Sequence, residues 1–140
     1  MLRNIVIGFV AIIILFTPAC KGKKSAEEKA AIVAAEKWLA LVDGGEYAKS
    51  WDEAADYFKK AITKDQWTQT IKGVRPPIGK MISRKVESST YATSLPGAPD
   101  GEYVVIIFNT SFENKKSAIE TVTPMKDKDG KWRLSGYFIK

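Results

Sequence analysis

The fold of this chain is decided by residues 102–139, which read EYVVIIFNTSFENKKSAIETVTPMKDKDGKWRLSGYFI. Along this stretch β-branched and aromatic residues recur with a period of two, the pattern of antiparallel strands. It predicts three strands, over residues 102–112, 117–125 and 131–139. Residues 127–130 carry the polar and glycine residues of a tight turn, so the last two strands should form a hairpin. The first of the three is the most apolar, and we expect it near the centre of the sheet.

Working outward, a fourth strand is expected directly before this stretch. Residues 81–95 are rich in serine and threonine and follow Gly79, and they should bend near Ser88 and Ser89. Residues 96–101, PGAPDG, form a loop into the next strand. The second half of the chain therefore predicts a sheet of four antiparallel strands.

Helical spacing replaces this pattern upstream of Gly79. Ser25 and Glu28 have the spacing of a capping box and begin a helix that Gly44 and Gly45 end. Residues 46–62 place apolar residues on one face and predict a second helix.

The second helix has a further capping pattern inside it, at Ser50 and Glu53, which suggests one turn, a kink and then a longer helix. The pattern recurs at Thr63 and Gln66 and begins a third helix, which ends at residues 75–79, RPPIG. Helices first and strands after predict an α+β domain, with three helices packed on one face of a strongly curved sheet.

This order of elements, with the closing motif DGKWRL at residues 129–134, resembles the nuclear-transport-factor-two-like and cystatin-like fold group. Within that group the chain is similar to small exported bacterial proteins of domain-of-unknown-function family four thousand and nineteen. The resemblance covers about residues 31–140. It implies a cone whose mouth lies between the helices and the concave sheet, and it implies no specific activity. The residues that carry it are Ser50-Trp51, Ala54-Ala55, Phe58, Trp67, Arg75-Pro76, Gly79, Leu95-Pro96-Gly97, residues 100–105 (DGEYVV), residues 120–123 (ETVT), residues 129–134 and Gly136-Tyr137.

The first 24 residues have a different character. An apolar run of 12 residues, Ile5–Phe16, is too short to cross a bilayer and has the length of the hydrophobic part of a secretory signal. Ala19 before Cys20 resembles the end of a bacterial lipoprotein leader, where the cysteine is lipidated after cleavage. We therefore expect a signal peptide at residues 1–19, a lipidated cysteine and tether at 20–24, and a single domain at 25–140.

Ordinary cleavage by signal peptidase at the same bond stays open, because Thr17 and Pro18 depart from the lipoprotein pattern. A single cysteine in an exported chain has no disulfide partner, and lipidation of Cys20 explains both its solitude and its position. The expected location is the periplasmic side of a membrane. Lys21 after the cysteine suggests the outer membrane by resemblance to lipoprotein sorting; a soluble periplasmic or secreted form is the alternative.

The net charge of +6 belongs mostly to the leader. Four of the 22 basic residues and none of the 16 acidic ones precede Ser25, so residues 25–140 carry a net charge of only +2. Short basic runs such as Arg84-Lys85 are typical of solvated strand edges, and nucleic acid is not an expected partner. The chain has no histidine and no phosphate-binding, nucleophile or zinc motif, so we expect no cofactor and no metal.

Glu120, in the middle of an expected strand, is the first candidate for a functional residue. Paired with Arg133 on the neighbouring strand it could line a pocket, although a cross-strand ion pair on the solvent face is the more common arrangement. Burial beside aromatic residues would instead make Glu120 a candidate general base.

Four other residues are candidates for a pocket. Asn109 lies in the apolar central strand, and Arg75 lies at the end of the third helix, where capping of the last carbonyls competes with anion binding. Trp51 and Tyr137 belong to a set of aromatic residues that are mostly core, but both keep polar groups that could face a cavity.

Together these residues favour a non-catalytic binding or protein-interaction domain attached to a membrane. Its partner would be an envelope protein or a small apolar ligand. The alternative is an enzyme that uses Glu120 as acid or base in an aromatic pocket. A third possibility is a homodimer formed through the open face of the sheet.

Overall fold

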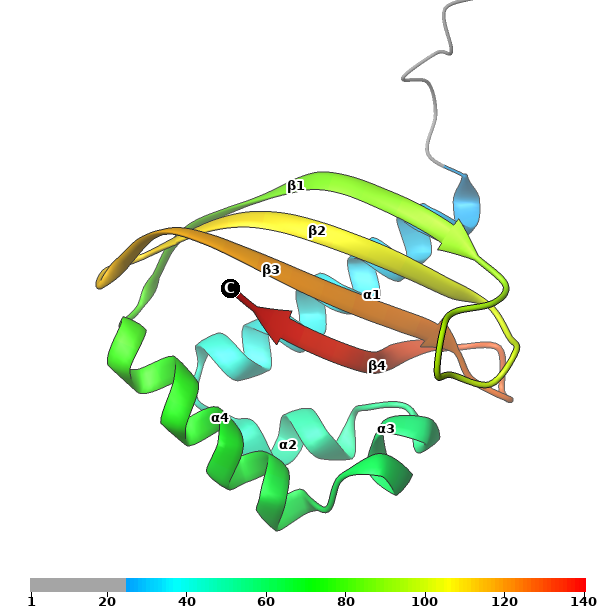
Figure 1. Ribbon diagram of the computed structural model, residues 1–140, viewed down its shortest axis with the longest axis horizontal. Coiled ribbons are helices and arrows are strands. Elements are labelled where there is room, and N and C mark those ends of the chain that lie inside the picture. The colour runs from blue at the N-terminus through cyan, green and yellow to red at the C-terminus, as the bar shows by residue number, and fades with distance from the viewer. Residues whose placement is uncertain (1–24) are drawn as a thin grey trace, which may run out of the picture.

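The computed structural model describes residues 25–140, so the predicted leader and Cys20 lie outside the described residues. Helices come first and strands follow, as expected, and Figure 1 shows the resulting two layers. The elements are α1 (Ala26–Asp43), α2 (Tyr47–Asp52), α3 (Asp56–Ala61), α4 (Lys64–Ile78), β1 (Met81–Ala92), β2 (Tyr103–Phe112), β3 (Lys115–Lys126) and β4 (Trp132–Ile139).

The helix ends follow the predicted capping residues in two of three cases. The side chains of Thr63 and Gln66 form a complete capping box at the start of α4, in which each accepts a hydrogen bond from the backbone N–H of the other residue. Ser25 accepts a hydrogen bond from the Glu28 backbone, whereas the Glu28 carboxylate accepts one from Ser89 of β1. Ser50 caps no helix, and its hydroxyl donates to the Tyr47 carbonyl instead.

The expected helix over residues 46–62 is in fact two short helices, α2 and α3. Between them the Ala55 N–H donates to the Leu134 carbonyl of β4, at 2.8 Å. A hydrogen bond to a strand replaces the helical one here, and the chain turns. The third expected helix, α4, keeps Pro76 and Pro77 in its last turn and ends at Gly79, whose φ of 81° favours glycine.

The sheet is an antiparallel meander in the order β1-β2-β3-β4. A register shift between Val86 and Ser88 gives β1 a bulge at the position of the expected bend. The molecule is therefore an α+β fold with a four-stranded antiparallel sheet, as predicted, but with four helices among residues 25–140.

All helices lie on one side of the curved sheet. In Figure 1, α1 passes behind the strands, and it contacts all four of them. In β2 and β3, residues 104, 106, 108, 110 and 112 and residues 118, 120, 122 and 124 point toward this side and are buried, whereas most of the residues between them point to the opposite, outer face. No helix within residues 25–140 is long and apolar enough to span a membrane. The core consists of Ala31, Ala35, Trp38, Leu39, Val42, Ala54, Phe58, Trp67, Ile71, Val104, Ile106, Phe108, Val122 and Leu134.

Candidate functional site

A network of charged side chains lies buried where α1, α4 and the sheet meet. Arg84 of β1 is at its centre and is mostly buried, contrary to the expectation of a solvated strand edge. Its Nη1 and Nη2 donate to the two carboxylate oxygens of Asp43, at 2.7 and 2.9 Å, and its Nε donates to Glu120 Oε1 at 2.8 Å. The end of α1 is thereby connected to β1 and β3 by charge-assisted hydrogen bonds.

Glu120 is fully buried and faces the helices. Besides Arg84, the Thr110 hydroxyl donates to its Oε1 at 2.6 Å, and the Tyr137 hydroxyl donates to its Oε2. Both carboxylate oxygens are therefore occupied by partners from three different strands.

The predicted pairing of Glu120 with Arg133 is wrong. Along the β3–β4 ladder Glu120 lies opposite Ile139, whereas Arg133 lies opposite Met125 near the other end of the strands. Arg133 instead donates to Asp127 at 3.2 Å and to Asp129 at 2.7 Å, around the hairpin turn. The physical reason is the register, which places the two side chains several residues apart along the sheet.

Arg75 joins the network from α4 and is only 4% exposed. Its Nη2 donates to Asp43 Oδ1 at 2.9 Å, and its guanidinium lies 4.7 Å from the centre of the Phe112 ring. Within the part of the chain that the structure describes, its Nε and Nη1 have no hydrogen-bond partner. Arg75 therefore binds the end of α1 rather than the carbonyls of its own helix.

The network changes the pKa values of its members. Burial alone would raise the pKa of Asp43, but hydrogen bonds and charge from Arg84 and Arg75 outweigh it and lower that pKa below its ordinary value. Burial and the nearby Glu120 carboxylate raise the pKa of Tyr137 well above its ordinary value of 10.0. For Arg84, burial opposes the charge, but hydrogen bonds to Asp43 and Glu120 prevail and raise the pKa further. At neutral pH Asp43 and Arg84 thus stay charged, and Tyr137 keeps its phenol proton.

The other predicted residues lie apart from this network. Trp51 is half-buried, with its Nε1 donating to the Ile62 carbonyl at 2.9 Å, so it fixes α2 to the chain after α3. Asn109 is exposed on the outer face of the sheet. The structure thus brings Arg75, Glu120 and Tyr137 together and leaves Trp51, Asn109 and Arg133 elsewhere.

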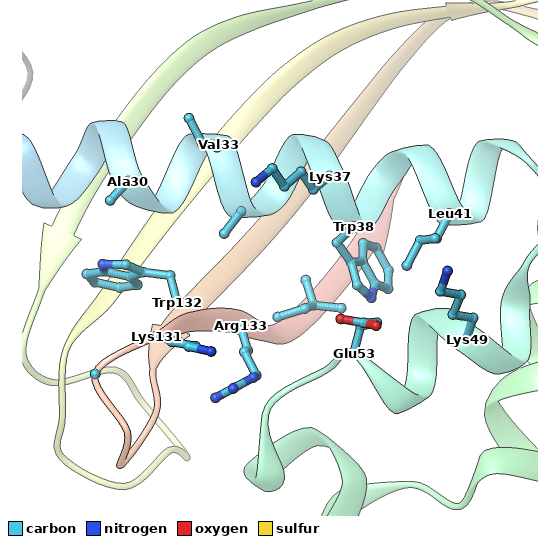
Figure 2. A pocket seen from close by; sticks show the side chains of 13 residues that line it. Ala30, Val33, Lys37, Trp38, Leu41, Lys49, Glu53, Lys131, Trp132 and Arg133 are labelled. Atoms are coloured by element: carbon cyan, nitrogen blue, oxygen red, sulfur yellow. The ribbon is translucent and has the colours of Figure 1, made fainter.

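An open groove lies between α1, α2 and β4, with a volume of about 570 Å³ (Figure 2). Trp132 lies at one end of it and Trp38 and Leu41 at the other. The Trp38 indole N–H donates to the Ser50 carbonyl at 2.8 Å, which fixes that ring. The lining residues are Ala30, Val33, Ala34, Lys37, Trp38, Leu41, Lys49, Glu53, Gly130, Lys131, Trp132, Arg133 and Leu134.

Sequence reasoning missed this groove except for Arg133. One signal was available: α1 carries Val33, half exposed, beside the small residues Ala30 and Ala34, and this leaves room next to an apolar side chain. Trp132 in the closing motif was a second signal, because an aromatic residue beside a turn is often partly exposed.

The groove is basic at its rim. Lys37, Lys49 and Lys131 form no ion pair with any residue between 25 and 140, and Glu53 is the one acidic residue in its lining. No group of three or more potential metal ligands occurs among the described residues. Chemically, the groove offers aromatic and aliphatic surface to an apolar group and ammonium groups to an anion.

Comparison with known proteins gives one match. The family model described as "Protein of unknown function (DUF4019)" matches residues 34–137, a range that contains both the buried network and most of the groove. Neither the curated proteins nor the solved structures yield a match. Since the model covers well over half of the sequence, the chain belongs to the DUF4019 family.

Proposed function

We propose that this protein is an exported, lipid-anchored binding domain without catalytic activity, and that the groove between α1 and β4 is its binding site. The observation that carries the proposal is the groove itself, which is open and lined by apolar and aromatic side chains with lysines at the rim. Such surface is usually covered in the core of a domain of this size, and a concave apolar site with few polar groups is typical of ligand binding.

The charges at the rim of the groove indicate which chemical group the ligand carries. Lys37 of α1, Lys49 of α2 and Lys131 before β4 come from three parts of the chain and surround the apolar floor. Because these ammonium groups form no ion pairs within residues 25–140, an anionic group on the ligand would satisfy them. An apolar molecule or side chain with one acidic end fits this arrangement.

The buried network supports a structural role for Glu120 rather than acid–base chemistry. A general base must lie within hydrogen-bonding distance of a substrate proton, but both oxygens of Glu120 already have donors and its side chain is fully buried. Nor does Glu120 line the groove.

Export and anchoring rest on the sequence of residues 1–24. Mass spectrometry of the mature protein from a double-membrane bacterium tests them directly. A diacylglycerol-modified and acylated Cys20 at the new N-terminus is the expected result. An unmodified Cys20 would end the anchoring proposal and leave the binding proposal standing.

Binding is tested with residues 25–140, which contain every element and the whole described core. The probe is anilinonaphthalene sulfonate, an apolar anion that fluoresces when it leaves water. Val33→Asp, placed in the groove, should weaken its binding about tenfold through lost apolar contact and charge repulsion. Ile82→Asp is the matched control, because Ile82 is similarly exposed (56% against 50%) but lies on β1.

Equal binding by the two variants would place the probe elsewhere and contradict the proposal. A hydrolase or isomerase activity that Glu120→Gln abolishes, with the fold intact by circular dichroism, would contradict it as well.

A further inference from the structure

The outer face of the sheet carries a second hollow, of about 660 Å³, across β1, β2 and β3. Four lysines line it, Lys85, Lys115, Lys116 and Lys140, and we call this region the lysine end of the outer face. Its other lining residues are Ser83, Asn109, Thr110, Ser111, Ser117, Ala118 and Ile119, and none of them is acidic.

Strand register places these side chains in rows. Lys85 lies opposite Asn109, and Asn109 lies opposite Ile119. Ile119 and Lys140 exchange backbone hydrogen bonds of 3.0 and 2.9 Å, so the row continues to the end of the chain. Ser83 lies opposite Ser111 one row away. Ammonium, amide and hydroxyl groups thus share one surface of the sheet with Ile119.

These lysines are unpaired in the described structure, unlike others in the chain. Lys64 pairs with Asp52, and Lys126 pairs with Glu27 and Glu102. By contrast, no lysine of the lysine end forms an ion pair with a residue in the range 25–140. Their charge is therefore available for an anionic partner.

Large apolar side chains adjoin the lysines on the same face. Ile119 is 43% exposed within the lysine row, and Phe138 is 63% exposed in the next row, opposite Thr121. Apolar side chains that are exposed in neighbouring rows of one face form a patch, and such patches mark interaction surfaces. Lysines beside exposed phenylalanine and isoleucine are typical of surfaces at the boundary between lipid headgroups and acyl chains.

The position of the N-terminus of the domain and the length of the tether limit where the membrane can lie. The Glu28 carboxylate in the first turn of α1 accepts a hydrogen bond from Ser89, so the N-terminus of the domain lies beside the C-terminal half of β1. The lysine end lies toward the other end of the sheet, at the β2–β3 hairpin (Figure 1). Five peptide units join Cys20 to Ser25 and reach at most about 17 Å when extended. The Ser25 end of an anchored domain therefore stays within that distance of the membrane, and this reach is compatible with the outer face of the sheet lying flat on the membrane.

We propose that the lysine end of the outer face lies on the membrane that holds the anchor and binds the phosphate groups of anionic lipid headgroups. The proposal rests on the lipid anchor of the proposed function. Several lysines together attract an anionic surface strongly, and the same charges would repel the lysine end of a second copy facing it. The orientation leaves the groove between α1 and β4, on the other side of the sheet, open to its ligand.

The test uses the lipid-anchored protein in two kinds of vesicle, phosphatidylcholine alone and equal parts phosphatidylcholine and phosphatidylglycerol. A water-soluble amine-acylating reagent labels exposed lysines, and mass spectrometry quantifies each site. Labelling at the lysine end should fall about fivefold in the anionic vesicles relative to the neutral ones. Lys60 of α3 and Lys72 of α4 are exposed on the helical side, and their labelling should be equal in both.

A pair of charge-reversed variants sharpens the result. Lys115→Glu with Lys116→Glu changes the β2–β3 hairpin and should remove the protection of Lys85 and Lys140. Lys60→Glu with Lys72→Glu makes the same change of charge on the helical side and should leave that protection intact.

Three results would overturn the proposal. A protein attached to both vesicles whose lysines label equally in both refutes the orientation alone, whereas a protein that attaches to neither refutes the anchor and the orientation with it. In neutral detergent without vesicles, protection by inorganic phosphate or by polyglutamate would point to a soluble phosphorylated ligand or an acidic peptide instead.

Discussion

The buried network around Arg84 and the groove beside Trp132 both lie on the helical side of the sheet, but they differ in how their charges are satisfied. In the network, Asp43 and Glu120 face Arg75 and Arg84, and most polar atoms have partners. In the groove, lysines surround apolar surface with a single acidic residue among them. The most chemically suggestive carboxylate in the described residues, Glu120, thus connects three strands of the fold, whereas the groove that we propose as the binding site lies where charges are left without partners.

The largest expected effect is in the network. Glu120→Ala removes three hydrogen bonds and leaves Arg84 partly unpaired in the interior, so we expect a loss of about 3–5 kcal/mol in the free energy of unfolding. Denaturant titration followed by circular dichroism measures it. Glu53→Ala, at the rim of the groove, is the control and should change stability by no more than about 0.5 kcal/mol. Similar losses in the two variants would erase the distinction between the regions.

A smaller loss is expected for Arg75→Met. This change removes one partner of Asp43, but Asp43 keeps both hydrogen bonds from Arg84, and two nitrogen atoms without hydrogen-bond partners leave the interior. We expect about 1–3 kcal/mol, measured by the same titration. A loss as large as that of Glu120→Ala would indicate that Arg75 is fully hydrogen-bonded in solution, through groups such as buried water.

The pH dependence of stability tests the network without breaking it. The pKa of Tyr137 is raised in the folded protein, so its contribution is fully present below the unfolded value of about 10 and is lost as pH rises above that value. We expect the free energy of unfolding of the wild type to fall more steeply above pH 10 than that of Tyr137→Phe. Denaturant titrations of both proteins at a series of pH values measure the difference. Parallel curves would show that the phenol is not held in its protonated form by Glu120.

At acid pH, the pH dependence of the free energy of unfolding has the opposite sign. The pKa of Asp43 is lowered in the folded protein, so the stability it contributes is present above its ordinary pKa of 3.8 and is lost as pH falls below that value. Asp43→Asn should have a flatter stability curve in this range, measured by the same titrations. An unchanged slope would assign the acid sensitivity to other carboxylates.

The fold could be predicted because its signals are local. Strand alternation in residues 102–139 and the capping box at Thr63 each depend on residues close together in the chain. The break between α2 and α3 could not be predicted in this way, because it depends on a hydrogen bond from Ala55 to Leu134, which is far away in the sequence. The periodicity of apolar residues indicates which helices and strands form, whereas long-range contacts decide where they end.

The network was only half visible in the sequence for the same reason. Glu120 and Tyr137 were candidates, but the central residue, Arg84, looked like part of a solvated run with Lys85. Neighbours on a strand point to opposite faces, so Arg84 enters the interior while Lys85 stays on the outer face. The register of β1 determines which of the two side chains points into the interior. That register shifts between Met81 and Ser83 and again between Val86 and Ser88, and the sequence pattern does not predict these shifts.

The smallest effect on stability, and the sharpest contrast, is expected at the rim of the groove. Lys37→Ala removes an exposed ammonium group without an ion-pair partner among residues 25–140, so the free energy of unfolding should change by at most about 0.5 kcal/mol. Binding of anilinonaphthalene sulfonate should nevertheless weaken about threefold, and less so as salt concentration rises, because one attractive charge is lost. Lys72→Ala on α4 is the matched control and should change neither quantity. If Lys37→Ala alters stability instead of binding, its charge supports the fold as those of the network do, and the groove loses its claim to be a ligand site.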